Sequence, residues 1–107
     1  MKPASVECAE IVCAGIAGAQ PLALEFGKRS PDAFQRGIEN ARRYIVSNSK
    51  RESFLLCTIA RTLSRIACPT GYEGRPIGYD NDYVVVQCGF LYHFIGVYND
   101  ELAKAKA

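Results

Sequence analysis

The side chains best suited to nucleophilic chemistry in this 107-residue chain are its five cysteines and its single histidine, His93. Cys88 is the cysteine nearest to that histidine, and the two would act as nucleophile and general base. On a helix, however, a separation of five residues places two side chains about 140° apart, whereas residues three or four apart face each other. The spacing therefore argues against a thiol catalyst.

Other catalytic and metal-binding patterns are missing from the sequence. No two cysteines form a Cys-x-x-Cys pair, and a tetrahedral zinc site needs four ligands of the Cys or His type at suitable spacings. Gly71, Gly74 and Gly78 are too loosely spaced for a phosphate-binding loop, and no paired carboxylates share a face of a core helix. We therefore expect a protein that is not an enzyme and holds no cofactor and no metal.

Two apolar segments bear on where the protein resides. Residues 11–19 resemble the apolar part of a signal peptide, but Lys2 before them is countered by Glu7 and Glu10. Residues 83–99 carry no Lys, Arg, Asp or Glu, yet a helix of that length reaches only about 25 Å, less than the ~30 Å hydrocarbon core. With all five thiols expected to be free, we predict a cytoplasmic protein without a membrane span.

Basic residues are concentrated in the middle of the chain. Residues 28–75 hold ten Lys and Arg against four acids, while the net charge of the whole chain is only +2. A basic segment attracts nucleic acid or an acidic protein surface. Residues 31–67 are expected to form two helices with a short polar turn, as in a helix-turn-helix, and Arg51, Arg61 and Arg65 can lie on its exposed face. The second helix becomes apolar after its first turn, so nucleic acid is the less favoured partner.

The elements that position these side chains are predicted to be helices. We expect one all-α domain over residues 1–107, a compact bundle of about four helices with a long apolar C-terminal helix. The first helix is expected to start at Ser5 and to break or kink at Pro21. Pro31 suits the first position of the second helix, and the hydroxyl of Ser30 can cap the free backbone N–H groups there.

The second half of the chain begins with another helix start. Ser49-Lys50-Arg51-Glu52 has the pattern of a capping box, and the helix that it opens is expected to end at Cys68-Pro69. Residues 69–80 are rich in Gly, Pro and Tyr and predict a shaped loop. Loops of this length are uncommon unless they have a role.

Residues 83–98 are rich in strand-forming residues, so a β-hairpin around Gln87-Cys88-Gly89 is a rival to a helix. Helical spacing decides between them, since one set of apolar residues recurs at intervals of 4, 3, 4, 3 and 4: Val84, Cys88, Leu91, Ile95, Tyr98 and Leu102. A second stripe has similar spacing: Val86, Phe90, Phe94 and Val97. The pattern predicts a helix that is apolar on two faces.

A helix of this kind must be covered on both faces. We expect the three preceding helices to cover one face, and a second copy of the helix or a partner protein to cover the other. The alternative is that the helix forms the centre of a monomeric bundle. The predicted partner or dimer interface comprises Tyr79, Tyr83, Val86, Phe90, Leu91, Phe94, Ile95 and Tyr98.

In length, helical layout and lack of a catalytic constellation, the chain resembles the small bacterial anti-activators that sequester quorum-sensing transcription factors. The resemblance rests on the whole chain and assigns no functional residue. It implies a homodimer that occupies the dimerisation surface of a LuxR-type receptor and so blocks DNA binding. We therefore expect a non-enzymatic regulatory protein that binds a transcription factor. The alternative is a DNA-binding protein that uses the basic helices of residues 31–67.

Overall fold

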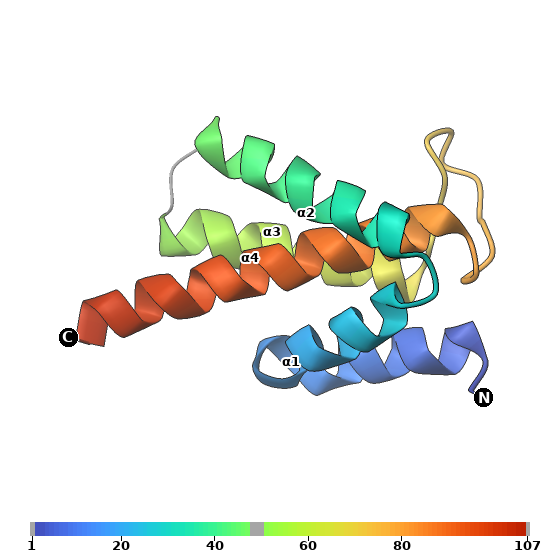
Figure 1. Ribbon diagram of the computed structural model, residues 1–107, viewed down its shortest axis with the longest axis horizontal. Helices are drawn as coiled ribbons and strands as arrows, with labels where there is room; N and C mark the ends of the chain where they lie inside the picture. The colour runs from blue at the N-terminus through green and yellow to red at the C-terminus, as the bar shows by residue number, and fades with distance from the viewer. Residues whose placement is uncertain (1, 48–50, 107) are drawn as a thin grey trace.

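The computed structural model describes residues 2–47 and 51–106, and within these ranges the chain forms helices and no strand. The helices are α1 (Ala4–Gly27), α2 (Pro31–Val46), α3 (Glu52–Ala67) and α4 (Asp82–Lys106) (Figure 1). The predicted all-α bundle with a long C-terminal helix is confirmed. The rival hairpin around Gln87–Gly89 is wrong, because α4 runs through these residues without a break.

The start of each helix agrees only in part with the capping predicted from the sequence. Pro31 is the first residue of α2, as expected, but the hydroxyl of Ser30 makes no capping hydrogen bond. Two of the four residues of the predicted capping box, 49 and 50, lie outside the described residues, so that prediction stays untested.

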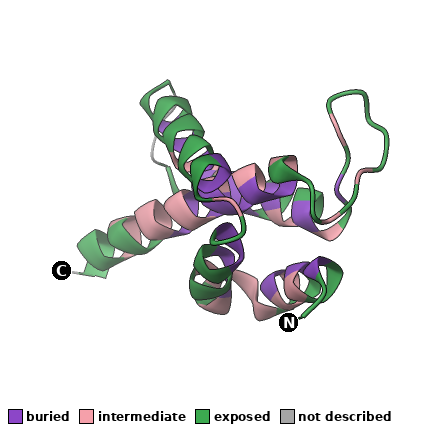
Figure 2. Cartoon of the chain, turned by 45° about the vertical axis from the view of Figure 1, so that its right-hand side comes forward, coloured by how far each residue is buried: buried purple, intermediate pink, exposed green. Residues whose placement is uncertain are grey.

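The long helix α4 lies at the centre of the bundle and packs against each of the other three helices (Figure 1). The part of α4 between Val84 and Ile95 is the most deeply buried, and Figure 2 shows the buried residues gathered where the helices cross. The expected contact with a second copy stays a prediction, since the structure describes a single chain and leaves Val86, Phe90 and Tyr98 of α4 partly exposed. Three helices surround it, as in the alternative of a central bundle helix.

Two glycines allow α2 to approach α4 this closely. A Cβ atom on Gly89 would lie 2.1 Å from the carbonyl oxygen of Phe34, and one on Gly37 would lie 2.1 Å from the carbonyl oxygen of Val86. Both distances are far below van der Waals contact, so any side chain at either position would push the helices apart. The backbones of α2 and α4 thus touch at this crossing.

α1 is bent back on itself rather than straight. Gly15 has φ 68° and ψ −171°, a non-helical conformation that interrupts the helix, and the two halves then lie side by side (Figure 1). Just after the end of α1, Arg29 Nε donates to Glu7 Oε2 (3.2 Å) and Arg29 Nη2 donates to the carbonyl oxygen of Lys2 (3.1 Å). The predicted break at Pro21 is wrong, because the helix continues through this residue. The break lies at Gly15 instead, where the backbone angles are ones that only glycine adopts readily.

Among the described helices, α1 meets the length and composition of a membrane span, with 24 residues and a mean hydropathy of 1.2. This is weak evidence, since core helices and signal sequences meet the same test. Bent at Gly15, each half measures about 16–18 Å, shorter than the ~30 Å hydrocarbon core. In this fold α1 serves as a helical hairpin that packs on α4.

Gly15→Ala is expected to lower the free energy of unfolding by about 1–3 kcal/mol, because alanine is strained at a positive φ with extended ψ. No atom lies within 4 Å of a Cβ built on Gly15, so the loss would come from the backbone and not from a clash. Urea unfolding followed by circular dichroism measures it. Gly78→Ala is the control, since its nearest neighbour is at 4.0 Å and its φ is not positive; equal stability of the two variants would contradict the prediction.

Candidate protein-binding surface

The structure divides the eight predicted interface residues into two groups. Leu91, Phe94 and Ile95 are 0% exposed, so the chain's own core buries them and they form no accessible surface in this conformation. The other five are partly exposed: Tyr79, Tyr83, Val86, Phe90 and Tyr98. The hydroxyl of Tyr79 donates to the carbonyl oxygen of Ala67 (2.9 Å), which ties the loop of residues 69–80 to the end of α3.

An aromatic cluster joins α2, α3 and α4. Tyr44 of α2 lies 5.5 Å from Phe54 of α3 and 6.0 Å from Phe90 of α4, measured between ring centroids. Below them, Phe90 and Phe94 are stacked at 4.8 Å. No Cα atoms of α2 and α3 approach within 8 Å in the described parts of these helices, so these rings connect the two helices across α4.

Tyr44 and Phe54 belong to this surface but are not among the interface residues predicted from the sequence. Tyr44 is 39% exposed and Phe54 is partly buried. A signal for Tyr44 was present, because Phe34, Gly37, Ala41 and Tyr44 follow one another at intervals of 3, 4 and 3 on one side of the helix. A second apolar stripe, Phe34, Ile38, Ala41 and Ile45, lies beside it, and spacing alone does not decide which side of the helix faces the core.

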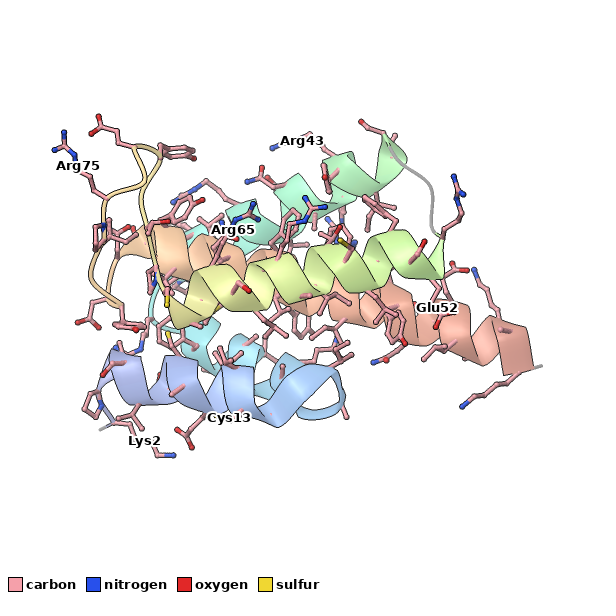
Figure 3. The ribbon with its side chains drawn as sticks, turned by 180° about the vertical axis from the view of Figure 1, so that it is seen from behind. Lys2, Cys13, Arg43, Glu52, Arg65 and Arg75 are labelled. Atoms are coloured by element: carbon pink, nitrogen blue, oxygen red, sulfur yellow. The ribbon has the colours of Figure 1, made fainter. Side chains whose placement is uncertain are left out.

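Exposed arginines flank these rings on both helices. Arg36 and Arg43 belong to α2, and Arg61 and Arg65 to α3, at intervals that keep each pair on one side of its helix. None of the four forms an ion pair with another described residue. Figure 3 shows Arg43 on α2 and Arg65 on the side of α3 that is turned toward α2. We call these four arginines with Tyr44, Phe54 and Phe90 the aromatic–arginine surface.

One electrostatic contact shows how close the two sides of this surface lie. Arg61 Nη2 donates to Cys57 Sγ at 3.5 Å, and this hydrogen bond and the charge of Cys57 raise the pKa of Arg61. The Tyr44 hydroxyl raises the pKa of the same guanidinium further, from the other helix. Arg61 therefore lies near both the thiol of Cys57 on its own helix and Tyr44 on α2.

Eight of the eleven acidic residues lie outside α2 and α3, which carry the other three, Asp32, Glu39 and Glu52. Glu7, Glu10 and Glu25 line a hollow of about 250 Å³ between the two halves of α1. Glu10 pairs with Lys2 at 2.9 Å, and Glu7 pairs with Arg29 at 3.2 Å. These carboxylates already have partners within the chain. The carboxylates of α1 are thus paired, whereas Arg36, Arg43, Arg61 and Arg65 form no ion pair with another described residue.

Cys88 and His93 do not form a nucleophile–base pair among the described residues. Cys88 is fully buried, and this burial raises the pKa of its thiol. Burial likewise raises the pKa of Cys8 to about 11, although Arg29 opposes the shift. Partial burial and the charge of Arg42 lower the pKa of His93, and no hydrogen bond among the described residues joins it to Cys88. A protonated buried thiol is a poor nucleophile.

The described residues contain no group of three or more His, Cys, Asp and Glu that could hold a metal ion. All five cysteines are free, with two buried and three exposed. In the native protein we expect a thiol reagent of the Ellman type to react quickly with Cys13, Cys57 and Cys68. Cys8 and Cys88 should react only after unfolding, because both are inaccessible. Rapid modification of all five cysteines would show that α1 does not pack on α4 as described.

A buried hydroxyl lies on the stripe of α3 that carries Phe54, Arg61 and Arg65. Thr58 Oγ1 has no hydrogen-bond partner among the described residues, and such a group costs about 1–3 kcal/mol. Thr58→Val is therefore expected to leave the free energy of unfolding unchanged or to raise it by about 1 kcal/mol in urea unfolding.

Thr62→Val is the matched variant for this prediction. The hydroxyl of Thr62 donates to the carbonyl oxygen of Thr58 at 2.8 Å, so its loss is expected to lower the free energy of unfolding by about 0.5–1.5 kcal/mol. If both variants destabilise the protein equally, the hydroxyl of Thr58 forms a hydrogen bond in the folded protein, which would contradict the prediction.

Comparison with known proteins found no relative of this chain. No protein-family model matches the chain, and no curated protein and no solved structure matches it. The candidate surface is therefore argued from its side chains, which are partly exposed rings at the centre and, on either side, arginines that form no ion pair with another described residue.

Proposed function

We propose that this protein is a non-enzymatic, cytoplasmic regulatory module that binds a transcriptional regulator and blocks its dimerisation or DNA binding. The observation that carries the proposal is the aromatic–arginine surface. Tyr and Arg are among the residue types that contribute most binding energy at protein interfaces, above all when they lie together. The resemblance to bacterial anti-activators supports a LuxR-type quorum-sensing receptor as the regulator.

The size of the molecule is sufficient for such binding. A standard interface buries about 800 Å² on each partner, which is about an eighth of the 6336 Å² exposed by this chain. Affinity depends on a few well-packed anchors more than on area. Tyr44, with its ring supported by Phe54, Phe90 and Phe94, is suited to be such an anchor.

The resemblance also supports a homodimer as the free form, and we retain this as part of the proposal. Because the middle of α4 is covered within the chain, contact between copies would use its partly exposed residues Val86, Tyr98 and Leu102. Light scattering should give twice the 11.8 kDa mass of the chain. A measured mass of one chain would reject the homodimer but would not contradict the proposed regulator-binding surface.

The test of the function is a gel-shift series with a LuxR-type regulator and its DNA site. Adding this protein should abolish the regulator's shift, and the protein alone should give no shift at physiological salt. Tyr44→Ala should weaken the inhibition, while Val46→Ala, a change at an exposed residue nearby, should not. An unaffected shift at saturating protein would reject the proposal for this class of regulator.

The alternative function is DNA binding through the helices of residues 31–67. Arg36, Arg43, Arg61 and Arg65, which form no ion pair with another described residue, favour it, because phosphate contacts by Arg and Lys supply much of the affinity for DNA. The same gel-shift series distinguishes the two functions. A direct shift of DNA by this protein, lost steeply as salt rises, would support the alternative and contradict the anti-activator.

A further inference from the structure

We infer that the aromatic–arginine surface binds an acidic amphipathic segment of its protein partner, with apolar side chains against the rings and Asp or Glu side chains against the arginines. This inference rests on the proposed function and names the chemistry of the partner at the same surface. It follows from three features of the surface: its partly exposed rings, its arginines and the distribution of charge over the rest of the molecule.

The centre of the surface is suited to apolar side chains. Tyr44 is 39% exposed, and Phe54 and Phe90 are partly exposed beside it. Because the described parts of α2 and α3 do not approach each other within 8 Å between Cα atoms, these rings fill the space between the two helices above α4. Apolar residues at helical spacing on a partner segment can pack along such a strip, as in other helix-in-groove complexes.

The two sides of the surface are suited to carboxylates. Arg36 and Arg43 lie on α2, and Arg61 and Arg65 on α3, all exposed and without an ion pair to another described residue. Among the described residues Arg43 donates to the side chain of Asn40 and Arg61 to the thiol of Cys57, so both guanidinium groups retain donors for a ligand. Arg binds carboxylates in a bidentate manner, which adds orientation as well as attraction.

The remaining charge of the molecule favours a short acidic segment over a nucleic acid. The net charge is only +2, and acids lie on α1 (Glu7, Glu10, Glu25) and near the end of α4 (Asp100, Glu101). Duplex DNA carries one charge about every 1.7 Å along its axis, so these acids repel a long polyanion. A segment that spans only α2 and α3 meets more basic than acidic side chains, because these helices carry five arginines and three acids (Asp32, Glu39 and Glu52). The partner is therefore expected to be a protein.

The experiment uses a fluorescent helical peptide with Leu at positions i, i+3, i+4 and i+7 and Glu on its other face. A twin peptide with Gln in place of Glu is the first control. Anisotropy titrations should show that the full-length protein binds the Glu peptide at least about tenfold more tightly than the Gln peptide, with affinity falling as salt rises. Amide NMR shifts should be confined to the surroundings of Tyr44, Arg61 and Arg65.

Charge reversal tests whether the arginines carry the recognition. The double variant Arg61→Glu/Arg65→Glu should bind the Glu peptide at least about tenfold more weakly than the unmodified protein. Arg75→Glu/Lys104→Glu changes the net charge by the same amount at two exposed residues, which pair with Glu73 and Glu101 outside the surface. This control should bind the peptide as the unmodified protein does.

Four outcomes would overturn the inference: equal binding of both peptides, no binding of either, equal loss in both double variants, or tighter binding of a DNA oligonucleotide of equal charge. The last outcome would assign the surface to nucleic acid. Failure of the peptides while the protein still abolishes the regulator's gel shift would reject the acidic segment and leave the proposed function standing. Failure of both experiments would reject both.

Discussion

Gly89→Ala is expected to lower the free energy of unfolding by about 3 kcal/mol or more, or to prevent folding. A Cβ atom at this position would lie 2.1 Å from the carbonyl oxygen of Phe34 and 3.2 Å from its Cα. The obstacle is the backbone of α2, which cannot rotate away as a side chain can. Overpacking of this kind in a well-packed core costs about 1–3 kcal/mol and sometimes more.

Gly96→Ala on the same helix is the matched control. Its Cβ atom would meet Gln20 Nε2 at 3.2 Å, the end of a flexible side chain that donates to the carbonyl oxygen of Tyr92. Alanine also gains about 1 kcal/mol of helix propensity over glycine, so this variant should be nearly neutral. Urea unfolding of both variants measures the difference. Equal stability would mean that α2 and α4 do not touch at this crossing.

Phe94→Ala is expected to lower the free energy of unfolding by about 3–5 kcal/mol, the usual cost of truncating a buried phenylalanine. Phe94 is 0% exposed and lies 4.8 Å from Phe90, 6.1 Å from Phe54 and 6.2 Å from Tyr44 between ring centroids. It is the only fully buried ring of this cluster, so its removal leaves a cavity beneath the other three. Urea unfolding monitored by circular dichroism gives the value.

Two measurements separate a core role for Phe94 from the interface role that the sequence suggested. If Phe94 belongs to the core, the loss of stability will not depend on protein concentration. Val46→Ala, at a residue that is 86% exposed, should change the free energy of unfolding by less than about 0.5 kcal/mol. A Phe94→Ala protein that is fully stable but changes its oligomeric state would restore the interface assignment.

The two predictions also link the fold to the proposed binding. Gly89 sets how closely α2 lies on α4, and Phe94 supports the rings of Phe90 and Tyr44. Neither residue carries a charge, yet each affects where the arginines of α2 lie relative to those of α3. Variants that keep the fold but shift this spacing should bind an acidic partner more weakly without losing any charged side chain.

The sequence by itself determined the helices of this protein. Apolar residues at intervals of three and four predicted the helix that became α4, and Pro31 and Pro69 lie where α2 begins and shortly after α3 ends. These signals are local, because helical periodicity and the fixed φ of proline act within a few residues. The unfavourable spacing of Cys88 and His93 is local in the same sense, because it depends only on two residues five positions apart on one helix.

Only the tertiary structure decided which faces meet. The break in α1 falls at Gly15 and not at Pro21, because the return of the chain toward α4 requires a positive φ at the turn. Periodicity showed that α4 is apolar on two faces but not that three helices of the same chain cover it. Tyr44 and Phe54 meet through contacts with α4, which are long-range. Hydrophobic pattern identifies the faces that must be buried, whereas their partners are chosen by packing between segments far apart in sequence.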